Sequence, residues 1–203
     1  PVTYTTGTFA TSPDQKFVLA DIDLDGKVDV FSYSSTGVPQ VLRNTATAGV
    51  INSSTFAANA TITGVIPTSP TPKNVLAADL NNDGKIDIVV SKTNSTDVIV
   101  NNSSIGSLSL SNSFNIAIGH VYVIVDDLDK DGKNDIYLYN KYLKNNYTTG
   151  SLTSSNFTTY TNTLVDEGSS GSSSLDLNGD AYPEIYLGAW WSHLWLYINN
   201  ATG

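Results

Sequence analysis

Asp21-Ile-Asp23-Leu-Asp25-Gly26-Lys-Val-Asp29 is a nine-residue stretch with carboxylates at positions 1, 3, 5 and 9 and glycine at position 6. Oxygens on alternate residues of a tight turn can converge on one point, and glycine permits the sharp turn that this needs. Hard cations such as calcium take six to eight oxygen ligands in flexible geometry. The stretch therefore predicts an oxygen-rich loop suited to a hard divalent cation.

The same pattern returns three times along the chain. Fourteen of the nineteen acidic residues lie in the four loops, and such clustering of like charges is costly without a cation. Four copies in one register make this a repeat protein. The later copies are Asp79-Leu-Asn81-Asn-Asp83-Gly-Lys-Ile-Asp87, Asp127-Leu-Asp129-Lys-Asp131-Gly-Lys-Asn-Asp135 and Asp176-Leu-Asn178-Gly-Asp180-Ala-Tyr-Pro-Glu184.

The loops predict about four calcium ions per chain. Four divalent ions would bring the formal net charge from -9 to about -1, and the absence of cysteine argues against a softer metal. The alternative is four acidic turns without an ion, since Asp, Asn and Gly favour turns in any case. By analogy with other loops of this type, position 7 adds a backbone carbonyl. The expected ligands are Asp21, Asp23, Asp25, Lys27 and Asp29; Asp79, Asn81, Asp83, Lys85 and Asp87; Asp127, Asp129, Asp131, Lys133 and Asp135; and Asp176, Asn178, Asp180, Tyr182 and Glu184.

The segments around the loops exclude an EF-hand. That loop needs a bidentate glutamate at position 12 and a helix on each side. Position 12 here is Ser32, Val90, Leu138 or Leu187. The residues after each loop alternate in polarity or are rich in β-branched and aromatic side chains, which predicts strands.

The order strand, D-x-[DN]-x-[DN]-G-x-x-D, strand resembles the FG-GAP/VCBS repeat family, which includes blades similar to those of integrin α-subunit propellers. The resemblance covers nearly the whole chain. It implies an all-β fold, a β-propeller of four blades with calcium between the first two strands of each blade. The Phe-Gly and Gly-Ala-Pro segments of the integrin repeats are absent from this chain. Gly188-Ala189 is the nearest match to them. The fourth loop carries Gly179 at position 4 and Ala181 at position 6, so its ion site departs most from the pattern.

We expect one domain over residues 1–203. Its repeats span about 13–60, 73–116, 119–160 and 170–203, and residues 1–12, around Phe9, form a closing outer strand. The expected outer strands of the first three repeats contain Phe56, Phe114 and Phe157, and the fourth has none. Three architectures fit: a closed four-bladed ring, part of a larger propeller, or an array in which chains associate through their terminal strands.

The amino-acid composition excludes some classes of binding partner. The acidity argues against nucleic acid and against an anionic membrane surface, and no run is apolar enough to span a bilayer. Calcium loops of low affinity favour an extracellular or cell-surface location. Eight Asn-x-Ser/Thr sequons are potential glycosylation sites.

No catalytic constellation emerges, so we expect no enzyme. The two histidines, His120 and His193, have no evident nucleophile partner, and calcium would keep the acidic groups ionised. The stretch from Trp190 and Trp191 through His193 to Trp195 allows a sugar-stacking surface, but packing between blades is the favoured interpretation.

The function predicted is a non-enzymatic extracellular calcium-binding module for adhesion, ligand binding or surface assembly, with a protein or glycan ligand. The alternatives are a carbohydrate-binding lectin and an accessory module of a secreted carbohydrate-active enzyme.

Overall fold

The computed structural model describes residues 14–34, 39–52, 55–57, 60–61, 71–92, 95–117, 122–138, 141–161, 169–189 and 194–200. These residues form fifteen strands and one short 3-10 helix, η1 (Ser154–Asn156). The predicted all-β class is confirmed. Within the described ranges, no helix has the length and apolar character to cross a membrane.

The strands form four antiparallel sheets, and each sheet takes its strands in chain order. The first sheet contains β1 (Lys16–Ala20), β2 (Asp29–Tyr33), β3 (Gln40–Leu42) and β4 (Ala60–Thr61). The second contains β5 (Pro72–Ala78), β6 (Asp87–Lys92), β7 (Thr96–Asn101) and β8 (Leu110–Ala117). The third contains β9 (Ile124–Asp126), β10 (Asp135–Leu138), β11 (Lys141–Asn145) and β12 (Phe157–Thr161). The fourth contains β13 (Ser169–Leu175), β14 (Glu184–Ala189) and β15 (Leu194–Tyr197).

Each acidic loop joins the first two strands of its sheet, as predicted. The strand after the loop carries β-branched and aromatic residues, which suit a pleated and buried position. In β6 and β7 every residue is buried. Both faces of this sheet are therefore covered, and successive residues of β6 pack in opposite directions.

The hydrophobic core is divided among the interfaces between successive sheets. Phe31 of the first sheet packs in one cluster with Ile88 and Val90 of the second. Val89, on the other face of β6, packs in a second cluster with Ile136 of the third sheet. A third cluster joins residues of the third sheet, including Tyr137, to Ile185 and Leu187 of the fourth.

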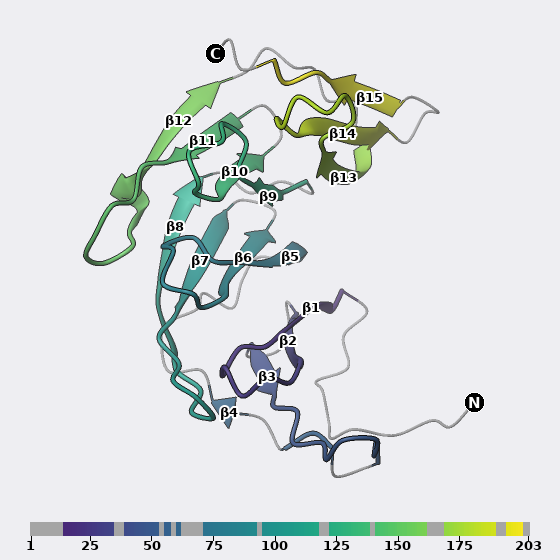
Figure 1. The fold of residues 1–203 in the computed structure, drawn as a ribbon, viewed down its shortest axis with the longest axis vertical. Helices are drawn as coiled ribbons and strands as arrows, with labels where there is room; N and C mark the ends of the chain where they lie inside the picture. Colours follow the sequence, from purple (N-terminus) through teal and green to yellow (C-terminus); the bar gives the residue numbers. More distant parts are fainter. Residues whose placement is uncertain are drawn as a thin grey trace.

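Figure 1 shows the four sheets following one another along an arc that is open on one side, with β1 and β15 toward its two ends. The described strands close no ring. The fourth sheet has three described strands, which agrees with the missing outer strand expected there. The segment around Phe9, expected to supply that strand, lies outside the described residues.

Two expectations about strands need correction. The outer strand of the first repeat is β4 rather than the segment around Phe56, because the main chain of Gln40 and Val41 pairs with β4. Phe56 forms an isolated bridge with Asn44, which extends the same ladder. The packing favoured for the tryptophan-rich stretch holds at Tyr197 of β15, which packs on the third sheet. Leu194, Trp195 and Leu196 are exposed.

Candidate metal centre

All four acidic loops adopt one backbone conformation. The residue at position 4 has positive φ in every copy, and so has the residue at position 6. Three loops place glycine at position 6, whereas the fourth places Gly179 at position 4 and Ala181 (φ 74°) at position 6. A left-handed conformation is strained for alanine. The fourth loop therefore keeps the turn despite its different sequence.

Backbone N–H groups orient the carboxylates of these loops. In the first loop the N–H of Gly26 donates to Asp21 Oδ2 (3.0 Å), and the N–H of Lys27 donates to Asp25 Oδ1 (3.0 Å). The same two bonds recur in the other three loops, at 2.8–3.0 Å and 2.9–3.1 Å. The residue at position 6 is thus needed for its N–H as well as for its turn.

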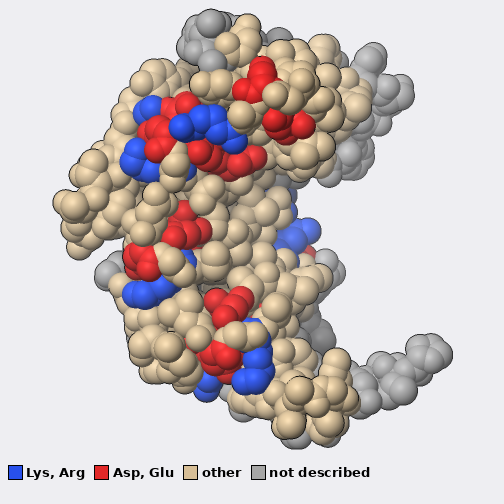
Figure 2. All heavy atoms as spheres, viewed as in Figure 1, with Lys and Arg blue, Asp and Glu red and all other residues tan. Residues whose placement is uncertain are grey.

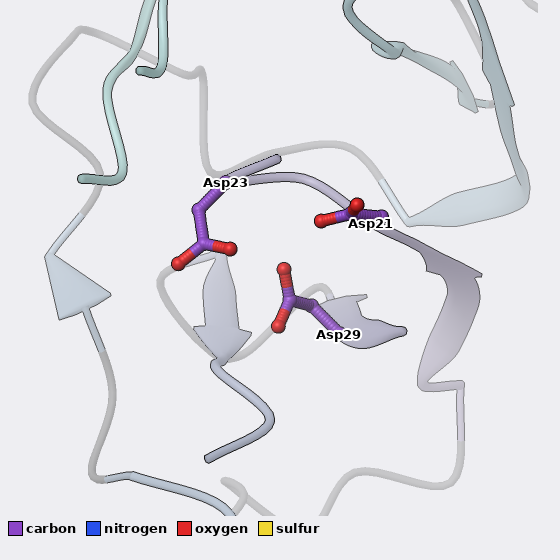
Figure 3. A group of neighbouring side chains, drawn as sticks. All are labelled: Asp21, Asp23 and Asp29. Atoms are coloured by element: carbon purple, nitrogen blue, oxygen red, sulfur yellow. The ribbon is translucent and has the colours of Figure 1, made fainter. Parts of the chain in front are cut away.

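The first and third loops each bring three carboxylates together. One oxygen from each of Asp21, Asp23 and Asp29 lies within 4.8 Å of the others, and Figure 3 shows the three side chains turned toward one another. The third loop does the same with Asp127, Asp129 and Asp135. Calcium–oxygen distances are about 2.3–2.6 Å, so oxygens around one ion lie up to about 5 Å apart. Both clusters have the chemistry and spacing to hold a metal ion.

Buried oxygens without hydrogen-bond partners mark the same two loops. Asp23 is fully buried, and its Oδ1 has no hydrogen-bond partner. Asp127 Oδ1 is also buried without a partner. A buried carboxylate oxygen without a partner is costly, and a cation would satisfy it. The donor set therefore fits a hard cation.

The second and fourth loops are poorer in carboxylates because asparagine stands at position 3. Asn81 Oδ1 accepts the N–H of Asp83 (3.1 Å). Asn178 Oδ1 accepts the N–H of Asp180 (2.8 Å), and its amide donates to Glu184 (3.2 Å). Three converging carboxylates occur only in the first and third loops of the described chain.

The acid at position 9 has a structural partner in each loop. The carboxylate of Asp87 is fully buried and accepts the N–H groups of Leu80 (3.0 Å) and Asn101 (2.8 Å). Burial raises the pKa of Asp87 to about 6, and it also raises the pKa of Asp135 to about 6. In the first three loops, position 9 thus connects the loop to the asparagine at the end of the third strand.

Two basic side chains that the sequence patterns did not single out reach the carboxylate clusters. Arg43 pairs with Asp23, and Lys144 pairs with Asp129 and with Asp131 (Nζ to Oδ2, 3.4 Å). Figure 2 shows acidic side chains in separate patches along one face, with Lys or Arg among them. The equivalent residues of the other repeats are Val100 and Ile198, one residue before an asparagine. Without a metal ion, these cations offset part of the negative charge of the two carboxylate-rich loops.

Sequence analysis also missed four asparagines at the ends of the third strands. Their amides donate to the backbone carbonyl at position 8 of their own loop, at 3.0–3.3 Å. In three repeats the same amide also reaches a carbonyl of the preceding loop. The available signal was an asparagine that follows the third apolar run of every repeat. These residues are Asn44, Asn101, Asn145 and Asn199.

Several predicted residues are not placed. Trp190, Trp191, His193 and His120 lie outside the described residues. The position-7 residues are described, and the ammonium groups of Lys27 and Lys133 pair with the position-5 carboxylates at 2.9 and 2.8 Å. Their backbone carbonyls remain predicted ligands.

Comparison with known proteins gives a family and a fold. The FG-GAP-like repeat family matches residues 21–90 and 79–138, which together are more than half of the chain. No curated protein matches. Among solved structures, a lectin of Agrocybe aegerita, described as recognising non-reducing terminal N-acetylglucosamine, matches with a TM-score of 0.60 at 17% identity.

The lectin match covers 92% of this chain and 49% of the lectin chain, so the chain spans about half of the lectin's length. The V. cholerae biofilm matrix protein Bap1 matches with a TM-score of 0.47 at 14% identity, over 92% of this chain and 28% of that chain. The likeness to the lectin concerns the fold alone.

Proposed function

The chain belongs to the FG-GAP-like repeat family, and from this premise we propose that it is a non-catalytic binding module whose acidic loops hold calcium. The observation that carries the proposal is the convergence of Asp21, Asp23 and Asp29, with the buried Oδ1 of Asp23 lacking a partner. Calcium binding by the native loops would stabilise the fold, because the unfolded chain offers no such site.

The proposed ligands are the residues at positions 1, 3, 5 and 9, together with the position-7 carbonyl, in each of four loops. The shared backbone of the loops supports four sites, including the fourth loop with Ala181. The first and third sites carry an extra carboxylate at position 3, so we expect them to be the more acidic of the four. About four calcium ions per chain follow.

The four sheets are proposed to be blades of a β-propeller. Their strands run in chain order, their faces pack on neighbouring sheets, and they follow an arc (Figure 1). An extracellular or cell-surface location accords with calcium sites of low affinity, which fill at millimolar calcium. Adhesion, ligand binding or surface assembly would then depend on calcium through the stability of the blades.

A second candidate is carbohydrate binding. It is supported by the likeness of fold to a lectin and by the tryptophan-rich stretch of sequence that begins at Trp190. Indole rings stack on sugar rings through their apolar faces. A glycan array probed with the calcium-loaded chain tests it. Loss of a positive signal in a Trp190→Ala, Trp191→Ala variant would assign the ligand to these two residues.

Native mass spectrometry and calorimetric titration with calcium test the metal proposal directly. We expect about four ions per native chain and a raised thermal midpoint. The double variant Asp23→Ala, Asp129→Ala should lose two ions. Asp14→Ala removes an acid outside the four loops and should keep all ions. Absence of bound metal in the parent chain at millimolar calcium would refute the proposal.

A further inference from the structure

Contacts between successive sheets recur in register along the chain. We call the side of a sheet that faces the following sheet its trailing face, and the side toward the preceding sheet its leading face. At each junction an asparagine amide of the later repeat donates to the position-2 carbonyl of the earlier loop. The pairs are Asn101 to Ile22 (2.9 Å), Asn145 to Leu80 (2.7 Å) and Asn199 to Leu128 (2.7 Å).

Each end of the arc carries one unmatched half of this contact. Asn44 makes the bond to its own loop, at Val28 (3.1 Å), as the other three asparagines do to theirs. Within the described chain, however, its amide reaches no carbonyl of another loop. The position-2 carbonyl of the fourth loop, at Leu177, likewise receives no asparagine amide from the described residues. The donor and the acceptor of a fourth junction are thus both present.

Apolar side chains are exposed at the same two ends. The position-2 side chain is at most 5% exposed in the first three loops, but Leu177 is 51% exposed. Four residues before each loop, Val75 and Val123 are at most 3% exposed, whereas Phe17 is 65% exposed. The equivalent positions are buried only where a neighbouring sheet covers them. The other exposed apolar residues of these two faces are Leu19, Leu175, Leu194, Leu196 and Ile198.

The surface beside Asn44 is hollowed. A hollow of about 470 Å³ is lined by Asn44, Lys27 and the loop over residues 46–51. In the second repeat, the loop that follows Asn101 contacts the preceding acidic loop. The N–H of Gly106 donates to the carbonyl of Asp23 (2.8 Å). The hollow therefore lies where an acidic loop of a preceding sheet would be held, and Lys27 adds a positive charge to it.

We propose that the trailing face of the fourth repeat binds the leading face of the first repeat in a second copy of this chain. Leu177 then lies against Phe17, and its carbonyl accepts the amide of Asn44. The junction continues the three internal ones with the same hydrogen bond and the same apolar positions. The two faces differ, so the contact is heterologous and joins chains head to tail. They lie toward opposite ends of the open arc (Figure 1), which places the junction between chains.

Complementation between two single variants tests the proposal. Phe17→Lys puts a charge on the leading face of the first repeat and leaves the trailing face of the fourth repeat unchanged. Leu177→Lys puts a charge on the trailing face and leaves the leading face unchanged. Both positions are more than half exposed, so the fold should tolerate lysine. Ile105→Lys is the matched control, because Ile105 is 81% exposed and lies on neither face. Circular dichroism and thermal midpoints establish that every variant is folded.

Sedimentation velocity over a wide range of concentration gives the readout. The parent chain and Ile105→Lys should associate as concentration rises, and each face variant alone should remain monomeric. An equimolar mixture of the two variants should form a one-to-one dimer and nothing larger, because only one intact junction is available. A parent chain that stays monomeric would overturn the proposal. So would a face variant that still self-associates, because that face would then pair with itself.

Discussion

At the level of single residues, the acidic loops depend on two left-handed backbone positions. Three loops meet the second of these with glycine, and the fourth meets it with Ala181. The N–H of Ala181 still donates to Asp176 Oδ2 (2.9 Å), as the glycine N–H does in the other loops. The geometry of the loop is preserved. The left-handed residue that is not glycine stands at position 4 in the first three loops, as Leu24, Asn82 and Lys130, and at position 6 in the fourth, where Ala181 is strained.

Relieving that strain should stabilise the chain. Ala181→Gly is expected to raise the free energy of unfolding by about 0.5–1 kcal/mol, since the left-handed strain exceeds the entropy that glycine adds to the unfolded state. Urea unfolding of the metal-free protein measures it. Gly84→Ala is the mirror control: a Cβ there meets no atom within 4 Å, so its destabilisation reports the left-handed strain less the entropy that alanine removes from the unfolded state, with no steric contribution. An unchanged or lower stability of Ala181→Gly would contradict the assignment of strain.

The basic residues at the loops give a second prediction at this scale. Arg43 pairs with Oδ2 of Asp23, whereas Oδ1 has no hydrogen-bond partner, so the guanidinium charge opposes a cation at this carboxylate. Arg43→Met should therefore strengthen calcium binding at the first loop on the order of fivefold, since an ion pair of this kind contributes about 1 kcal/mol. Calorimetric titration measures the change. Lys73→Met removes the same charge from β5, and an equal gain there would trace the effect to net charge instead.

At the level of elements, the asparagines at the third-strand ends connect each sheet to its own loop and to the preceding one. Asn101 and Asn44 form a natural comparison. Each donates to the position-8 carbonyl of its own loop, and the Oδ1 of each accepts the N–H two residues later, at 2.9 Å. Asn101 adds the bond to Ile22 in the first loop.

Asn101→Ala should therefore lower the free energy of unfolding by about 1–3 kcal/mol more than Asn44→Ala, because it leaves the Ile22 carbonyl without its donor. Urea unfolding of both variants at low protein concentration, where chains stay separate, gives the difference. Equal losses would mean that the bond between repeats contributes nothing to stability.

At the level of the whole molecule, stability should depend on pH in opposite ways with and without calcium. Asp87 and Asp135 have folded pKa values of about 6, above the unfolded value near 3.8. The folded chain then binds more protons than the unfolded chain between these values. The contribution of these groups to the stability of the metal-free protein therefore falls as pH rises from about 4 to 6.

Calcium reverses this dependence because it requires ionised carboxylates. Thermal midpoints of demetallated and calcium-loaded protein should be close near pH 4.5 and should separate toward pH 7. Asp87→Asn cannot ionise, so it should reduce the pH dependence of the demetallated chain. A gap between the two midpoints that stays constant over this range would argue against calcium at these loops.

Some features could be predicted from sequence because they are local. Nine consecutive residues carry each set of oxygens, and the runs of β-branched or aromatic residues after them form the expected strands, as at β6 and β10. The family follows from the same pattern, and it is confirmed. The outer strand of the first repeat was misplaced because Phe56 and β4 both pair along the segment from Gln40 to Asn44, and local pattern does not choose between them.

By itself, the sequence determined the four-fold repeat, the β class and the acidic loops between the first two strands. Each copy is recognised from spacings of nine residues or fewer and from the period of a strand, and the repeat from the return of that pattern. The tertiary structure decided which residues act between repeats, such as Asn101 on Ile22, 79 positions away. It also decided that Arg43 reaches Asp23 and that Phe17 and Leu177 stay exposed. Those outcomes depend on which sheet lies beside which, and side-chain pattern within one repeat carries no information about its neighbour.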